Sequence, residues 1–182
     1  MATTTDLTRP TAITALLLSS LAAGVNLSLS TFLVPRLLES PTPTMLTQWA
    51  RTYSRGAKTI PTTAAVAAAA YIWLGWKAGP GGGVRVLGLG VRELYYAAAA
   101  LSVGMAPYTV LVMQGTNDEL HRLEKVANAQ KKAGVVGVAA AGDEVVVQEK
   151  SAKALVDWWG LLNLGRAGML IGGVVCGLVA TF

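Results

Sequence analysis

Long stretches without charged side chains constrain this sequence more than any other feature. The first stretch, Thr11 to Val34, has no charged residue between Arg9 and Arg36. A helix over this stretch is long enough to cross about 30 Å of hydrocarbon, at about 1.5 Å per residue. Three further apolar runs follow, at residues 60–76, 86–113 and 154–182. The pattern predicts an all-α, integral membrane four-helix bundle that forms a single domain over residues 1–182.

The composition agrees with a multi-pass membrane protein. Hydrophobic residues make up 53% of the chain and charged residues 14%, whereas a soluble domain carries charge on about a quarter of its residues. We expect the first run to be retained as a helix, because its apolar stretch is longer than that of a signal peptide.

Prolines and polar segments set the expected helix boundaries. We expect Pro35 to end the first span, Pro61 to lie in the first turn of the second, and Pro107 to kink the third. Residues 45–58 combine aromatic and basic side chains, which suits a short interfacial helix at headgroup level. The third helix is expected to continue unbroken into polar residues, and residues 130–150 to form an irregular loop.

The positive charge of the chain lies mainly beside the apolar runs. Because the formal net charge of +5 gathers in the connections, we expect contacts with membrane lipid and no nucleic acid. The connections after the first and third spans hold ten of the basic residues: Arg36, Arg51, Arg55, Lys58, Arg122, Lys125, Lys131, Lys132, Lys150 and Lys153. The positive-inside tendency places these two connections in the cytoplasm.

Arg166 is the clearest case of a polar residue inside an apolar run. An arginine at the centre of a membrane helix raises the free energy of insertion by about 2.5 to 3.5 kcal/mol. Helical spacing places Trp159, Asn163, Arg166 and Leu170 on one face. Three interpretations stay open for the series Trp158, Trp159, Asn163 and Arg166. It can anchor the helix at the interface, form a structural polar knot with Glu93 or Asp157, or line a ligand cavity.

Two other helices carry polar pairs at helical spacing. Asn26 and Ser30 share a face of the first span, which is typical of hydrogen bonds between membrane helices. Asn117 and His121 share a face at the end of the third span. His121 is the only histidine, and an imidazole suits proton transfer near neutral pH. The alternative is a solvated side chain on a charged helix.

Together these features resemble the anthrone oxygenase family, which consists of small four-helix membrane proteins of polyketide pathways. Three of them carry the resemblance: Asn117 within the segment 107–120, the series Trp158, Trp159, Asn163 and Arg166, and Asn26 in the first span. Where members of that family carry a proline before the Thr-Asn pair, this chain has Gly115.

The resemblance implies oxidation of an anthrone to an anthraquinone by O₂, with no flavin, haem or nicotinamide cofactor. The residue inventory agrees, because one histidine and one cysteine, Cys176, are too few for a haem pair or a copper cluster. Few carboxylates lie in the membrane runs and no dinucleotide fingerprint is present, so neither a di-iron site nor a nucleotide cofactor is expected. We therefore expect no metal, and a polycyclic aromatic anthrone as the substrate.

The resemblance also assigns roles to individual residues. His121 is the candidate base, and Arg166 and Asn163 are candidate holders of the substrate oxyanion. Trp158 and Trp159 are expected to stack on the ring system, and Asn26 and Asn117 to orient it. The family resemblance further implies a secretory membrane such as the endoplasmic reticulum.

Two other classes of protein remain as alternatives. A non-enzymatic tetraspan scaffold commonly uses a cysteine-paired loop, which a single cysteine forbids. A small transporter subunit would need to associate, and the chain shows no paired broken helices. The alanine- and glycine-rich faces of the second and fourth spans permit close helix packing and hence a homo-oligomer.

Overall fold

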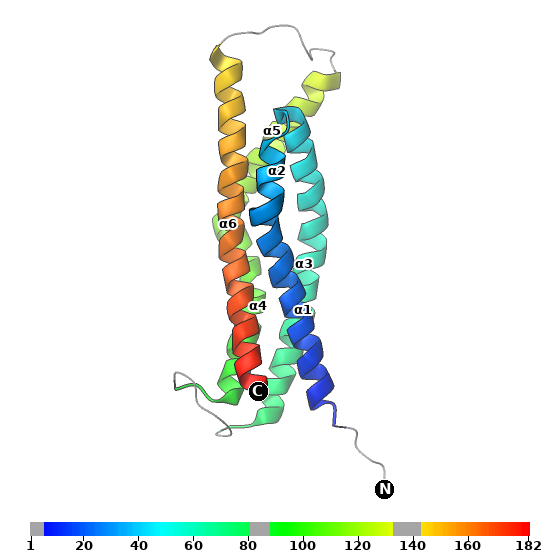
Figure 1. The fold of residues 1–182 in the computed structure, drawn as a ribbon, viewed down its shortest axis with the longest axis vertical. Helices are drawn as coiled ribbons and strands as arrows, with labels where there is room; N and C mark the ends of the chain where they lie inside the picture. Colours follow the sequence, from blue (N-terminus) through cyan, green and yellow to red (C-terminus); the bar gives the residue numbers. More distant parts are fainter. Residues whose placement is uncertain (1–5, 81–87, 133–142) are drawn as a thin grey trace. The chain divides into compact units, whose positions relative to one another are not determined.

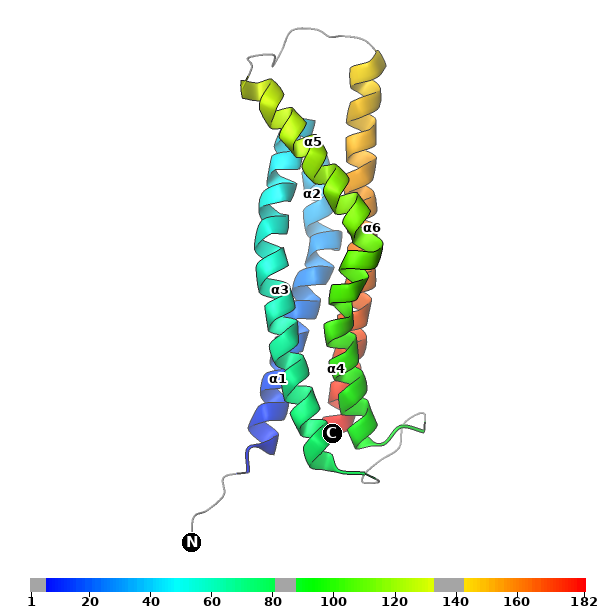
Figure 2. The same cartoon turned by 180° about the vertical axis from the view of Figure 1, so that it is seen from behind.

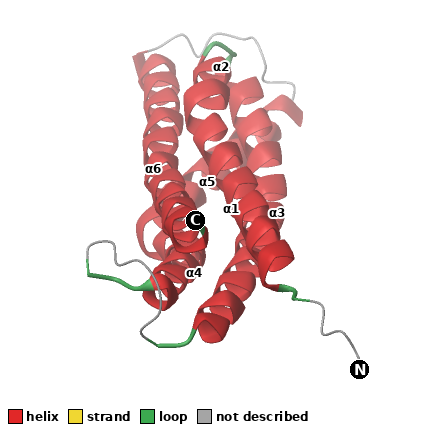
Figure 3. Ribbon diagram, turned by 60° about the horizontal axis from the view of Figure 1, so that its bottom comes forward, coloured by secondary structure: helices red, strands yellow, loops and turns green. Residues whose placement is uncertain are grey.

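The computed structural model of this chain describes residues 6–80, 88–132 and 143–182, and every element in these ranges is helical (Figures 1 and 3). The elements are α1 (Thr8–Ser28), η1 (Leu29–Leu33), α2 (Val34–Leu38), α3 (Thr42–Ala78), α4 (Val91–Tyr108), η2 (Thr109–Met113), α5 (Gln114–Lys132) and α6 (Asp143–Thr181). The two η elements are single π-helical turns. The predicted all-α class is confirmed for the described residues.

Three helical segments are long and apolar enough to cross a membrane: Thr8–Leu38, Val91–Lys131 and Lys150–Thr181. They correspond to the first, third and fourth predicted spans. The second predicted span, residues 60–76, is helical but lies inside the longer helix α3. It is not one of the three segments.

Two of the prolines behave differently from the sequence expectation. The helix does not end at Pro35, because this residue stands in the first turn of α2, directly after η1, where a missing N–H donor is tolerated. Pro61 lies inside α3 and not in a first turn, so residues 45–58 belong to the same helix as the second predicted span. Pro107 precedes the π-helical turn η2, a local distortion of the kind that marks helix kinks.

The connection before the last helix is also shorter than predicted. The expected continuation of the third helix into polar residues is confirmed, since α5 follows η2 without a break and ends at Lys132. Because α6 already begins at Asp143, the prediction of an irregular loop is wrong for residues 130–132 and 143–150. The remainder of that loop, 133–142, lies outside the described residues.

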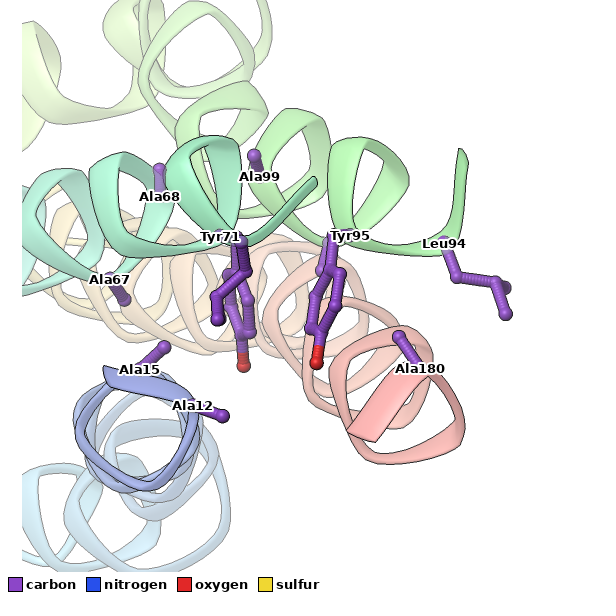
Figure 4. Packing of buried hydrophobic residues seen from close by; sticks show 11 residues of the cluster. Ala12, Ala15, Ala67, Ala68, Tyr71, Leu94, Tyr95, Ala99 and Ala180 are labelled. Atoms are coloured by element: carbon purple, nitrogen blue, oxygen red, sulfur yellow. The ribbon is translucent and has the colours of Figure 1, made fainter. Parts of the chain in front are cut away.

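The chain divides into two compact units. Unit 1 contains residues 1–25, 59–107 and 166–182, and unit 2 contains residues 26–58 and 108–165. In unit 1, Figure 2 shows the start of α1 beside the second half of α3, and Figure 4 shows the buried residues that pack there. Each unit has its own cluster of buried apolar side chains.

Small residues and two tyrosines build the core of unit 1. The stacked rings of Tyr71 and Tyr95 have centroids 6.2 Å apart, and alanines of α1, α3 and α6 surround them in Figure 4. Tyr71 shares a 2.8 Å hydrogen bond with Ser19 of α1, and Tyr95 shares one of 3.1 Å with Thr181 of α6. The small side chains let the helices approach closely, and the hydroxyls satisfy each other in the apolar interior.

Candidate functional site

Four rings from three helices of unit 2 form what we name the aromatic cluster: Trp49, Tyr53, His121 and Trp159. Trp49 and Tyr53 lie four residues apart on α3, and their stacked rings have centroids 5.3 Å apart. His121 of α5 meets both rings edge-on, with centroid distances of 4.9 Å to Trp49 and 5.0 Å to Tyr53. Edge-to-face contacts of this kind stabilise beyond simple area burial, by about 0.5–1.5 kcal/mol each.

Trp159 brings the last helix into the aromatic cluster. Its ring meets Trp49 at 85° with centroids 5.8 Å apart. Its indole N–H donates a 3.0 Å hydrogen bond to Oδ1 of Asn117 on α5. The side-chain amide of Asn163, one turn further along α6, donates to the carbonyl oxygen of Trp159 at 3.3 Å. All three side chains are buried, so two amides and one indole are held in fixed positions.

Trp49 occupies the centre of the aromatic cluster and differs from Trp159 in one respect. Its side chain is fully buried, and its Nε1–H has no hydrogen-bond partner among the described residues. A buried donor without a partner costs about 1–3 kcal/mol. Such groups are rare in native proteins and call for an explanation, and a ligand oxygen that accepts this N–H would supply one.

The structure therefore brings four of the seven predicted site residues together: Asn117, His121, Trp159 and Asn163. His121 is half-buried between two aromatic rings, so it is not the fully solvated imidazole that the alternative interpretation described. Its proposed role as a base stays a prediction.

The other three predicted residues are Trp158, Asn26 and Arg166. Trp158 faces away from its neighbour Trp159 and is half-exposed. It lines a separate groove of about 310 Å³ in unit 2, together with Asp157, Ser30 and Leu164. Because the two indoles point in different directions, they cannot both stack on one ligand.

Asn26 and Arg166 are both buried polar residues. Asn26 lies in α1, one turn before Ser30, whose hydroxyl donates a 2.7 Å hydrogen bond to the carbonyl oxygen of Gly160. This bond between α6 and η1 is of the interhelical kind that the sequence predicts for this face. Arg166 belongs to unit 1, and its burial, at 7% exposed, argues against a side chain that extends to water. Its role as an oxyanion holder stays a prediction.

Sequence reasoning missed Trp49 and Tyr53 as members of the site. Their position among basic residues indicated the headgroup level, whereas Trp49 is in fact fully buried. The available signal was the spacing of four residues, which places both rings on one face of a helix. The partner helix that this face meets is not encoded in that spacing.

The chemistry available in the aromatic cluster is that of an imidazole, aromatic walls and an indole N–H to which none of the described residues offers an acceptor. Metal binding has less support, because within residues 6–80, 88–131 and 150–182 no three His, Cys, Asp or Glu side chains gather as a ligand group. Fold and site together define a helical protein with membrane-length apolar segments and a buried aromatic site that includes one imidazole.

Comparison with known proteins gives the family. The chain belongs to the anthrone oxygenase family, whose sequence profile matches residues 49–176, and it is accordingly an oxygenase. This confirms the resemblance drawn from Asn117, Asn163 and Arg166. No solved structure matches the chain.

Three curated relatives illustrate the similarity. An anthrone oxygenase of Emericella nidulans is 35% identical over 117 residues, which cover 61% of this chain and 55% of that protein. The anthrone oxygenase AgnL2 of Paecilomyces divaricatus is 30% identical over 166 residues, or 90% of each chain. The anthrone oxygenase encC of Aspergillus fumigatus is 32% identical over 154 residues, covering 81% of this chain and 78% of that protein.

Proposed function

We propose that this chain is a membrane-bound oxygenase that converts an anthrone to an anthraquinone with O₂ in aromatic polyketide biosynthesis, without a flavin, haem or nicotinamide. The observation that carries the proposal is the aromatic cluster, in which His121 lies against Trp49 and the buried N–H of Trp49 has no hydrogen-bond partner in the described part of the chain. A planar ligand with phenol and carbonyl oxygens matches both the aromatic walls and the free donor.

The reaction needs a base and stabilisation of a developing negative charge. The central methylene of an anthrone is acidic, because its conjugate base is an aromatic phenolate. In this proposal His121 accepts one methylene proton. The indole N–H of Trp49 and the amide of Asn163 are donors for the oxyanion, and a water-excluded aromatic site strengthens both interactions.

Dioxygen then reacts with the electron-rich anion. The anion passes one electron to O₂, and the resulting carbon radical and superoxide combine to form a C–O bond. The peroxide takes up a proton to give a hydroperoxide. Loss of water removes the second methylene hydrogen, cleaves the O–O bond and leaves the carbonyl. One O₂ is consumed and one water is formed for each quinone, so no external reductant is required.

A membrane location suits this chemistry, because O₂ and planar polycyclic compounds both partition into lipid. Three segments have the length and apolarity to cross, and we propose that residues 60–76 of α3 form a fourth span. The helix is continuous there, and its buried Ala64, Ala67 and Ala68 permit the close packing that membrane helices use in place of strong hydropathy. An endoplasmic reticulum location is part of the same proposal.

The test is turnover by purified full-length protein in detergent. An anthrone is added under air, and quinone absorbance and O₂ uptake are followed together, with metal analysis of the same sample. We expect one O₂ per quinone in a preparation without stoichiometric metal or flavin. His121→Phe should lose turnover, whereas Gln48→Ala, an exposed change one residue from Trp49, should not. Absence of quinone formation above the air-oxidation rate would favour a scaffold or transporter subunit.

A further inference from the structure

A second site lies in unit 2, outside the aromatic cluster. An open groove of about 1000 Å³ runs between the first half of α3 and α5, and Figure 2 shows these two helices passing beside each other. On α3 it is lined by Thr47, Arg51, Ser54 and Arg55, and on α5 by Glu124 and Lys131, among others. The spacing of three, four and seven residues means that each helix contributes one continuous face.

The groove carries an excess of positive charge. Among the described residues that line it, three cations, Arg51, Arg55 and Lys131, accompany one carboxylate, Glu124, so their summed formal charge is +2. The carboxylate of Glu124 accepts a hydrogen bond from the side-chain amide of Asn128 on its own helix. Within the described part of the chain, neither Arg51 nor Lys131 forms an ion pair. Cations gathered in this way repel one another, and a bound anion would relieve that repulsion.

We propose that this groove binds a phosphomonoester anion, through the guanidinium groups of Arg51 and Arg55 and the ammonium of Lys131. A phosphomonoester carries a charge of about −1.5 to −2 at pH 7, which matches the net charge of the groove. The forked donors of arginine fit phosphate oxygens in pairs. The hydroxyls of Thr47 and Ser54, on the same wall, add neutral donors.

Such a phosphate has two sources. One is an anionic phospholipid headgroup, and the other is a soluble phosphorylated compound. Unit 2 also exposes large apolar side chains, among them Phe32, Val110 and Leu111, which suit contact with lipid tails. Arg51 and Arg55 precede the apolar run at residues 60–76 by nine and five residues, and basic residues that flank an apolar run are common at the headgroup level. A groove of this volume admits a headgroup as well as a small soluble phosphate.

The experiment measures binding to full-length protein in detergent with short-chain lipids that stay soluble. The probes are dioctanoyl phosphatidic acid, dioctanoyl phosphatidylcholine as a lipid without a phosphomonoester, and glycerol 3-phosphate as the soluble arm. The variant is Arg51→Ala with Lys131→Ala, both exposed side chains whose loss leaves the buried clusters intact. The matched control is Lys125→Ala, an exposed lysine of α5 that does not line the groove.

We expect the double variant to bind phosphatidic acid at least about tenfold more weakly than wild type, and the Lys125→Ala protein to bind normally. Binding of phosphatidic acid alone assigns the site to a lipid headgroup, and binding of glycerol 3-phosphate assigns it to a soluble phosphate. Equal affinity of the double variant and the control overturns the proposal. So does a wild-type protein that prefers neither phosphomonoester over phosphatidylcholine. The proposal does not depend on the oxidation chemistry, because no turnover is measured.

Discussion

The indole nitrogen of Trp159 donates a 3.0 Å hydrogen bond to the side-chain oxygen of Asn117, which lies 42 residues earlier in the chain. Both groups are buried, so the bond ties α5 to α6 at the point where Trp159 also meets Trp49. A buried hydrogen bond contributes about 1 kcal/mol, but loss of one partner costs more because the other is left unsatisfied. This bond therefore positions one wall of the aromatic cluster.

The first prediction concerns this pair. Asn117→Leu alone leaves the Trp159 donor buried without a partner, and we expect a loss of about 1–3 kcal/mol in unfolding free energy. Asn117→Leu combined with Trp159→Phe should lose less than the sum of the single changes. A double-mutant cycle on detergent-solubilised protein measures the coupling, expected at about 1 kcal/mol. Strict additivity would show that the two side chains do not interact in solution.

The second prediction concerns the indole N–H of Trp49. Because this donor has no partner among the described residues, Trp49→Phe removes a buried unsatisfied group, and this gain offsets part of the cost of the cavity that the smaller ring leaves at a fully buried position. The melting temperature should therefore fall by less than the lost volume alone would cause. Affinity for an anthraquinone should fall about fivefold, which corresponds to one lost hydrogen bond. Thermal unfolding with and without the quinone tests both. If wild type turns over anthrone and the variant binds quinone equally well, Trp49 is not the donor.

The third prediction concerns His121 as the base. His121→Phe keeps an aromatic ring between Trp49 and Tyr53 but cannot accept a proton. We expect the turnover rate to fall by about 10² or more, with a much smaller change in KM. Raising the pH should restore part of the turnover rate, because the substrate then ionises in solution and no longer needs a protein base. A kcat close to that of wild type at neutral pH would exclude this role and favour a substrate that is already ionised when bound.

The fourth prediction concerns Arg166, which is buried in α6. If its guanidinium stabilises negative charge on the substrate, Arg166→Leu should lower turnover by about 10² or more. Arg166→Lys should recover part of that loss, because it keeps the charge while losing the fork of donors. Circular dichroism and melting temperature establish that both variants are folded. Normal turnover of a folded Leu variant would leave Arg166 with a structural role only.

The fifth prediction concerns helix packing in unit 1. A Cβ on Gly177 would lie 2.6 Å from the hydroxyl oxygen of Tyr71 and 2.7 Å from its ring, and Tyr71 is fully buried. Gly177→Ala should therefore destabilise the protein by about 1–3 kcal/mol. Gly168→Ala on the same helix meets nothing within 4 Å and should be neutral or stabilising, since alanine favours helix. Thermal unfolding compares the two, and equal melting temperatures would contradict the close contact.

Local pattern predicted much of the helical architecture, with errors where helices continue past expected ends. The apolar runs located three membrane-length segments, because length and hydropathy are properties of contiguous residues. Pro35 misled one boundary, because a π-helical turn directly before it lets the helix continue. Pro61 misled another, because it lies inside α3 and not in a first turn. The alanine-rich second run resembles a weak span in isolation, although it is the second half of a longer helix.

The candidate site also has features that the local pattern predicts and features that depend on tertiary contacts. Helical spacing alone predicted that Trp159, Asn163, Arg166 and Leu170 would share a face, and all four are buried. The short motifs around Asn117 and Asn163 were enough to indicate the family, because they depend on residue identity at fixed spacing. Only the tertiary structure separated Trp159 from its neighbour Trp158 and placed Trp49 and Tyr53 around His121. Contacts between helices depend on the axial register and rotation of each helix against its neighbours, which no local periodicity contains.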